Sequence, residues 1–306
     1  MHKGLPGPMK PFRIPLLFLC MAGLCLAQNG TPPPPAPSST ASEAGDAWLE
    51  IDSSKIDTAA LTPRGRQVLE LEDIHWRHAQ TPHFVIHFEQ AIFARKVARM
   101  AEFMHGYIAG DLQGVSDHAE GRSHIFIFRS PKRWEEFRSV LPDVPAWSFS
   151  QVENTVLFLQ QADDTQTSGA ILAHEMTHII VNRFFPGDCP LWLNEGLATY
   201  YQEFGYAAFK GIKKSRRAQF TKLKEIYPLK NLLSLTDYPS QDWQIDSFYE
   251  TSKYLVGFLL LDKPPTLFTP FMEDMIGDMA PPDAFLKHYG IETLQELEKQ
   301  FRQFAQ

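Results

Sequence analysis

Two histidines and a glutamate form the group most suited to chemistry in this 306-residue chain. His174, Glu175 and His178 lie within residues 168–185, S-G-A-I-L-A-H-E-M-T-H-I-I-V-N-R-F-F. On a helix, this spacing places both imidazoles on one face, a turn apart, where their nitrogens can bind one metal ion. Glu175 then lies at the edge of that site, where a general base can take a proton from a water on the metal.

A second apolar stretch, which also has the pattern of a helix, supplies a third candidate ligand. It covers residues 191–204, and Glu195 near its start could meet the two histidines from an antiparallel helix. Two histidines and a carboxylate leave one zinc position open for water, as in catalytic zinc sites. We therefore predict Zn²⁺ as the cofactor, although these ligand types also accept neighbouring divalent ions. Asn194 and Thr199 are candidates to orient the ligands.

The two motifs together resemble those of a known family. H-E-M-T-H at 174–178 and W-L-N-E-G-L-A at 192–198 are similar to the gluzincin metallopeptidases, in particular the peptidase MA-like domains of bacteria. The separation of His178 and Glu195 is slightly shorter than in the thermolysin and aminopeptidase branches, which favours the MA-like group. The resemblance implies a zinc-dependent peptidase that acts on a peptide or protein substrate, with Glu175 as the base. It also implies an α+β fold with a small mixed sheet.

Two further residues are suggested by the same resemblance. Peptide hydrolysis builds charge on the carbonyl oxygen, which a hydrogen-bond donor beside the metal stabilises. Tyr249 resembles the tyrosine that supplies this donor in the aminopeptidase branch; Tyr254 is its rival, and both could be packing residues instead. Residues 152–154, V-E-N, resemble the end of an aminopeptidase motif whose glutamate holds the substrate amino terminus. That motif's glycine and methionine are missing here, so Glu153 could equally be an ordinary turn residue.

The elements that must position these residues follow from hydropathy patterns. Strands and helices alternate before the histidine motif, as strand 81–89, helix 90–109, strand 123–129 and helix 131–141. Residues 155–159 form a further strand. By the resemblance, it is the edge strand along the cleft, where free backbone groups could pair with an extended substrate. The part from residue 263 onwards is predicted to be helical.

The remaining histidines and the cysteine are expected to be structural. His83, His87 and His124 alternate with apolar residues on the predicted strands, and nothing near them repeats a ligand spacing. We expect them to face solvent rather than bind metal. Cys189 is the only cysteine after residue 27, so the exported chain has no internal disulfide. We expect its side chain to be a buried small hydrophobe rather than a ligand.

The first residues have the pattern of a targeting signal. Three basic residues precede an apolar run at 14–27, which is short for a membrane span and ends in small residues. We predict a signal peptide at 1–27 cleaved after Ala27, with a retained anchor as the alternative. A proline-rich linker at 28–47 and a catalytic domain at 48–306 follow. The protein is then exported, either periplasmic or secreted, with no stable membrane insertion after cleavage.

The charge balance excludes one class of partner. The formal net charge is −7, and loss of residues 1–27 makes it about −10, whereas nucleic-acid binding needs a basic surface. We therefore predict an exported zinc peptidase with no nucleic-acid partner. Two alternatives stay open: an inactive binding or scaffold protein with this fold, and an amidase or esterase that acts on a non-protein substrate. Glu175 argues against the inactive form, because metal binding alone needs no base.

Overall fold

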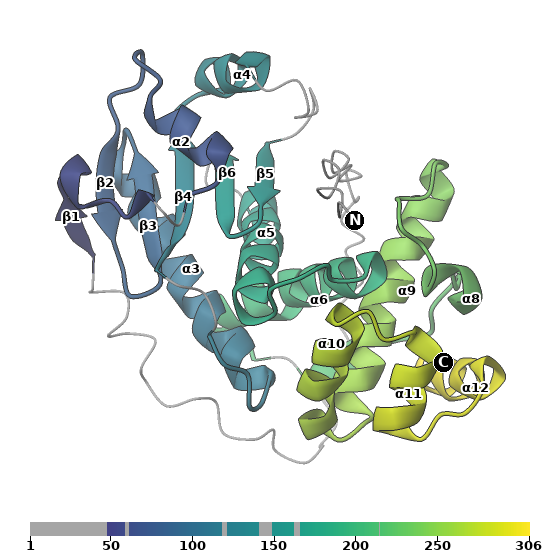
Figure 1. Ribbon diagram of the computed structural model, residues 1–306. Coiled ribbons are helices and arrows are strands. Elements are labelled where there is room, and N and C mark those ends of the chain that lie inside the picture. Colours follow the sequence, from purple (N-terminus) through teal and green to yellow (C-terminus); the bar gives the residue numbers. More distant parts are fainter. Residues whose placement is uncertain (1–47, 59–60, 118–120, 141–148, 162–165, 214) are drawn as a thin grey trace, which may run out of the picture.

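The chain adopts an α+β fold in which a six-stranded mixed sheet is followed by a helical C-terminal part (Figure 1). This computed structural model describes residues 48–58, 61–117, 121–140, 149–161, 166–213 and 215–306. The predicted signal peptide at 1–27 and linker at 28–47 lie outside the described residues. Within the described ranges, no helix has both the length and the apolar character that a membrane span requires.

The sheet has the strand order β1-β2-β3-β4-β6-β5. Its strands are β1 (Leu49–Ile51), β2 (Arg77–Gln80), β3 (Phe84–Phe88), β4 (Ser123–Phe128), β5 (Ser150–Glu153) and β6 (Val156–Gln160). The central strands β3, β4 and β6 are parallel, and the outer pairings are antiparallel. Helical crossovers between parallel strands explain the strand and helix alternation that the sequence predicts.

The helices are α2 (Pro63–Leu69), α3 (Ala91–Asp111), α4 (Pro131–Val140), α5 (Gln166–Phe184), α6 (Leu191–Phe209), α7 (Arg216–Gln219), α8 (Leu229–Leu232), α9 (Asp242–Leu261), α10 (Phe268–Ile276), α11 (Pro281–Tyr289) and α12 (Leu294–Phe304). Two short 3₁₀ helices are η1 (Ser53–Lys55) and η3 (Pro265–Leu267). The predicted helices at 90–109 and 131–141 agree closely with α3 and α4. The helical character predicted beyond residue 263 is confirmed by α10 to α12.

Both faces of the sheet are buried. One face packs with α3, α5, α6 and α9 in the main core, which includes Ile86, Ile125 and Leu157. The opposite face packs with α2 and α4 in a smaller aromatic core that includes Phe126 and Phe158. Figure 1 shows α5 and α6 between the sheet and the C-terminal helices. The helices that carry the candidate ligands therefore lie inside the molecule, held from both sides.

The prediction that residues 155–159 form the edge strand is wrong, because the neighbouring strand β5 lies at the edge instead. Residues 155–159 correspond to β6, which pairs with β4 on one side and β5 on the other. Among the described residues, the outer strand on this side of the sheet is β5, which precedes β6 in a tight hairpin whose turn residue Asn154 has a φ of 55°. Its sequence, S-Q-V-E, is short and has a single apolar residue, so it gave no clear strand pattern.

The expectation that the strand histidines face solvent is wrong for His87 and His124, whereas His83 is partly exposed. His87 and His124 are fully buried, and His78 on β2 is 8% exposed. Their rings form a chain in the smaller aromatic core, with His78 Nδ1 2.9 Å from His87 Nδ1 and His87 Nε2 2.9 Å from His124 Nδ1. A polar residue can occupy the inner face of a strand when neighbouring strands supply its hydrogen-bond partners.

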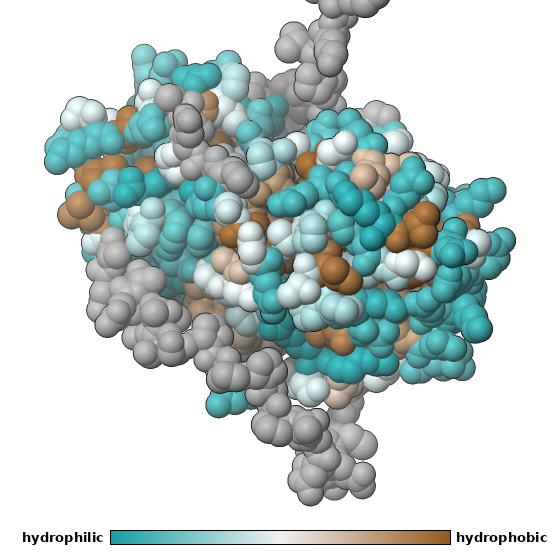
Figure 2. Space-filling view, turned by 60° about the horizontal axis from the view of Figure 1, so that its bottom comes forward, coloured by the Kyte–Doolittle hydropathy of each residue, from teal (hydrophilic) through white to brown (hydrophobic). Residues whose placement is uncertain are grey.

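The face of the molecule shown in Figure 2 is mainly hydrophilic, with apolar residues in small, separate groups. The large apolar side chains that are exposed among the described residues come from distant parts of the chain, for example Ile92, Phe149 and Trp243. Scattered apolar residues of this kind are normal on a protein surface.

Candidate metal centre

The three predicted ligands meet between α5 and α6. One ligand atom from each of His174, His178 and Glu195 lies within 4.8 Å of the other two. His174 Nε2 is 3.4 Å from Glu195 Oε2, and His178 Nε2 is 3.9 Å from Glu195 Oε1. The imidazole rings are 4.9 Å apart at an angle of 78°, as expected for two positions one helical turn apart that turn toward a common point.

Side-chain amides form hydrogen bonds with the Nδ1 atoms of both imidazoles, on the side of each ring away from the candidate metal position. His174 Nδ1 lies 3.0 Å from Gln202 Oε1, and His178 Nδ1 lies 2.9 Å from Asn194 Oδ1. An amide oxygen can only accept a hydrogen bond, so each Nδ1 carries the proton and donates it. In the neutral imidazole, Nε2 is then left with a lone pair that faces Glu195. Asn194 thus has the orienting position that the sequence suggests, whereas Gln202 was not predicted.

This donor set fits a metal cation. The two Nε2 lone pairs and the Glu195 carboxylate are all electron-pair donors, and together they converge in a nearly solvent-free space. His174, His178 and Glu195 are 5%, 4% and 1% exposed. Burial lowers the pKa of both histidines, which favours their neutral form. Such groups would repel one another without a positive charge between them, and N/O ligands of this kind suit zinc.

Glu175 lies beside the ligands and is held by the edge strand. Its Oε1 accepts a hydrogen bond of 2.9 Å from the Oγ of Ser150 on β5. Glu175 is 2% exposed, and this burial raises the pKa of its carboxyl to about 7, against the opposing effects of His174 and Ser150. Ser150 was not predicted, because β5 itself was not recognised.

Two tyrosines complete the centre. The hydroxyl of Tyr238, in the loop between α8 and α9, donates to Glu195 Oε1 at 2.6 Å. The predicted Tyr249 on α9 stacks against Tyr238 with ring centroids 6.3 Å apart. Burial, and then the negative charges of Glu195 and Glu175, raise the pKa of Tyr249, so both carboxylates act on its hydroxyl. Tyr238 was missed because its loop, T-D-Y-P-S, matches no ligand or catalytic motif.

Gly196 lets α9 approach the ligand helix. A Cβ atom at this position would lie 2.6 Å from the backbone oxygen of Ser252 on α9. Real side chains do not come this close, so only glycine permits the observed packing. The glycine that follows Glu195 in the sequence motif therefore has a local structural role: it brings the tyrosine-bearing helix against the centre.

Several residues singled out from the sequence do not reach the ligands. Tyr254 packs against Phe220, 4.8 Å between ring centroids. The Oγ1 of Thr199 is buried, with no hydrogen-bond partner among the described residues. The carboxylate of Glu153 accepts a hydrogen bond of 2.9 Å from the Oγ1 of Thr62, the residue before α2. Cys189 is half-buried against the main core, and burial raises its pKa, which favours the thiol.

Comparison of the chain with known protein families and with curated proteins finds no match. The resemblance to gluzincins therefore depends on the residues and geometry described above.

A second group of possible ligands lies at the far end of α5, and it fits a metal less well. Ligand atoms of His83, His105 and Asp117 come within 4.8 Å of one another. The rings of His83 and His105 are stacked, with centroids 3.6 Å apart and planes at 18°, so one ion cannot lie in both ring planes. Arg183 also donates to both Asp117 oxygens, at 3.1 and 2.7 Å. This group is better described as an ion-pair network.

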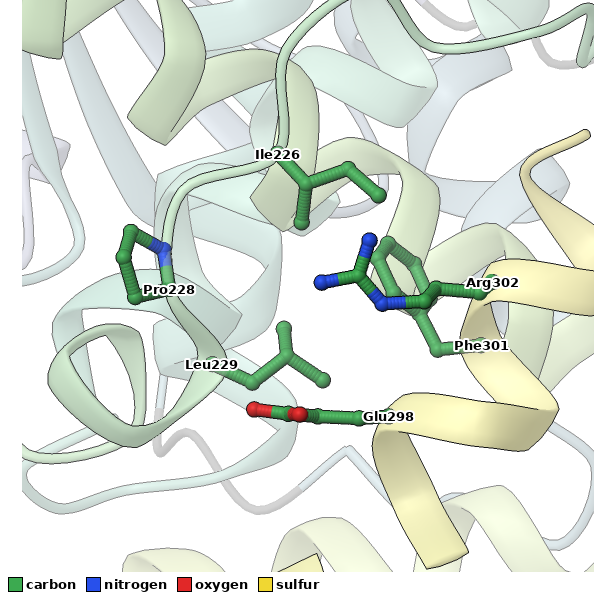
Figure 3. A pocket seen from close by; sticks show the side chains of 6 residues that line it. All are labelled: Ile226, Pro228, Leu229, Glu298, Phe301 and Arg302. Atoms are coloured by element: carbon green, nitrogen blue, oxygen red, sulfur yellow. The ribbon is translucent and has the colours of Figure 1, made fainter. Parts of the chain in front are cut away.

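A cavity of about 120 Å³ lies between α12 and the chain at residues 226–229. Figure 3 shows it lined by Ile226, Pro228, Leu229, Glu298, Phe301 and Arg302. None of the predicted site residues takes part in it. Its volume is also well below the roughly 300–1,000 Å³ of typical small-molecule sites.

Proposed function

We propose that this chain is a zinc-dependent peptidase of the gluzincin kind. The observation that carries the proposal is the convergence of His174, His178 and Glu195, three buried electron-pair donors within 4.8 Å of one another. A carboxylate adjacent to the first histidine, Glu175, adds the base that hydrolysis needs. A zinc site with its base would explain why His174, Glu175, His178 and Glu195, four ionisable groups, are buried together between α5 and α6.

His174, His178 and Glu195 are the residues that would hold zinc. A zinc ion bound there would acidify a water molecule and polarise the carbonyl group of a substrate. Gln202 and Asn194 keep the two imidazoles in the tautomer that binds metal through Nε2.

Glu175 moves the proton in this proposal. Ser150 occupies Oε1 of the carboxylate, so Oε2 is the oxygen that takes a proton from the attacking water. The same carboxylate then passes this proton to the leaving amine, which makes peptide cleavage complete. Burial of Glu175 keeps bulk water from competing for the proton.

The outer edge of β5 supports an extended peptide as the substrate. The backbone N–H of Gln160 on β6 donates to the carbonyl of Phe149 at 2.8 Å. Hydrogen-bonded positions alternate along antiparallel strands, so the amide and carbonyl of Ser150 point away from β6. Backbone groups on an open edge can pair with a peptide without reading its side chains. Ser150 would thus contact the substrate backbone and the base at once.

Tyr249 is the proposed donor to the carbonyl oxygen as charge builds on it. Its place beside the two carboxylates of the centre supports this role over Tyr254, whose ring packs on Phe220. Export to the periplasm or the medium is part of the proposal. It is based on the basic and apolar pattern of residues 1–27.

Hydrolysis of a quenched fluorescent peptide library by the full chain tests the proposal, with wild type beside Glu175→Gln and zinc measured in both. We expect one zinc in each protein and cleavage by wild type only, with a loss of about 10²- to 10⁴-fold in the variant. Zinc in both without cleavage by either would favour a non-peptide substrate or a binding role. Absence of zinc from the wild-type chain would refute the metal centre.

A further inference from the structure

The two carboxylate oxygens of Glu195 have different surroundings. Oε1 accepts the 2.6 Å hydrogen bond from the Tyr238 hydroxyl. Oε2 lies 3.4 Å from His174 Nε2 and has no hydrogen-bond partner among the described residues. Both oxygens lie near a histidine Nε2, since Oε1 is 3.9 Å from His178 Nε2, but only Oε1 also accepts the hydrogen bond from Tyr238.

Tyr238 is fixed in this position by aromatic packing. Its ring meets Phe248 edge-on at 6.0 Å and stacks on Tyr249 at 6.3 Å, both between ring centroids. These contacts come from α9, which Gly196 holds tightly against the ligand helix. The hydroxyl cannot leave Oε1 without disturbing the packing of both neighbouring rings.

A hydrogen bond from a hydroxyl to a carboxylate is charge-assisted and therefore strong. An oxygen that accepts such a bond is a poorer metal ligand than the second oxygen of the same carboxylate, since part of its electron density is already engaged. Carboxylates bind metals through one oxygen or through both. The choice matters here, because each position taken by Glu195 is lost to water or substrate.

We propose that Tyr238 is a positioning residue that commits Glu195 to binding the metal through Oε2 alone. It thereby keeps positions on the metal open for the water and the substrate carbonyl. This inference rests on the proposed metal centre and adds to it the residue that controls how many positions stay open.

The test uses the full chain with zinc and with cobalt(II) as a spectroscopic substitute. We expect wild type to give the intense visible absorption of cobalt with few ligands. Tyr238→Phe should weaken these bands, because Glu195 gains a second oxygen contact, and it should lower zinc affinity about 10- to 100-fold. Tyr254→Phe is the matched control: it also removes a tyrosine hydroxyl from the same region, but away from the centre, and both readouts should stay at the wild-type values.

Unchanged cobalt bands and zinc affinity in Tyr238→Phe would overturn the inference. If that variant does not fold, a crystal structure of the zinc-loaded wild-type protein decides: one Glu195 oxygen at bonding distance supports the inference, and two oppose it. A wild-type chain that binds no zinc overturns both the inference and the proposed function. Zinc binding without hydrolysis would count against the peptidase alone, and the spectra would still decide the role of Tyr238.

Discussion

Ser150 on the edge strand donates a hydrogen bond of 2.9 Å to Glu175 on the ligand helix. The contact joins two parts of the proposed machinery, the strand that would pair with substrate and the base that would move the proton. A shift of β5 along its partner would therefore move one oxygen of Glu175 as well. In the proposed mechanism, this single hydroxyl group would couple substrate pairing to proton transfer.

Removal of that hydroxyl should lower turnover without removing the metal. In Ser150→Ala, Glu175 loses the donor that fixes Oε1, and one hydrogen bond to a charged group corresponds to about tenfold in kcat. Zinc content should stay at the wild-type value, because Ser150 is not one of the candidate ligands. Steady-state kinetics on a cleaved peptide, with Ser150→Thr as the variant that keeps a hydroxyl, would test this. Equal loss in both variants would show that the hydroxyl is irrelevant.

The amides behind the two histidines should contribute to zinc affinity. Asn194→Ala and Gln202→Ala each remove the acceptor that selects the Nδ1–H tautomer, and we expect zinc affinity to fall about 10- to 100-fold. Competition with a chromogenic chelator measures this directly. Thr199→Val is the control on the same helix, since the Thr199 hydroxyl has no hydrogen-bond partner among the described residues. Its zinc affinity should match wild type, and a comparable loss there would contradict the assignment.

The close approach of α9 to the ligand helix predicts a strong effect at one glycine. In Gly196→Ala, the new methyl group would lie 2.6 Å from a backbone oxygen, so the helices must separate at a cost of about 1–3 kcal/mol. Thermal or urea unfolding would show the loss. Gly106→Ala on α3 is the control, because nothing lies within 4 Å of its Cβ position. It should be neutral or stabilising by up to about 1 kcal/mol. A Gly196→Ala protein as stable as wild type would rule out this packing.

The buried histidine chain predicts loss of stability in acid. Burial lowers the pKa of His124 from its ordinary 6.5 to about 4, against the opposing effect of Asp57, and burial also lowers the pKa of His87 well below its ordinary value. The unfolded chain therefore binds protons between pH 6.5 and 4 that the folded chain does not. The free energy of unfolding decreases as the pH falls through this window. For His124 alone, the loss by pH 5 is about 2 kcal/mol.

Urea unfolding of wild type and His124→Gln at pH 8, 6 and 5 tests this prediction. The variant starts less stable, because it loses ring packing, but its stability should decline less steeply with acid. The groups around this chain, Asp52 beside His78 and Asp57 beside His124, are carboxylates that favour the charged imidazoles and so moderate the effect. Parallel declines in the two proteins would mean that His124 titrates alike in the folded and unfolded states.

The ligand positions could be predicted from sequence because they follow local rules. A four-residue spacing on a helix fixes the relation of His174 to His178 whatever surrounds them, and the second motif supplied Glu195. The alternation of strands and helices and the helical C-terminal part followed from hydropathy patterns, and the α+β class followed from the family resemblance. These features depend on neighbours in the chain, and the sequence contains those neighbours.

The residues that support the centre could not be predicted, because each comes from another part of the chain. Ser150 reaches Glu175 only because β5 lies at the sheet edge, and Tyr238 reaches Glu195 from a loop with no motif. The same cause explains the errors. His87 and His124 look like surface residues in their own strands, and only the pairing of β3 with β4 makes them each other's partners. Glu153 resembles a substrate ligand until Thr62 is found beside it.

The hydrogen bonds of Arg183 bear on whether the candidate ligands are ordered before a metal ion binds. This buried guanidinium, in the last turn of α5, donates to Asp117, to the backbone oxygen of Gly121 and to the hydroxyl of Ser123. It anchors the C-terminal end of α5, beyond both candidate histidine ligands, and so opposes sliding or rotation of the helix. The imidazoles would then be ordered during folding, and a metal ion would meet side chains that already converge. Metal uptake should accordingly be fast, with little rearrangement of the backbone.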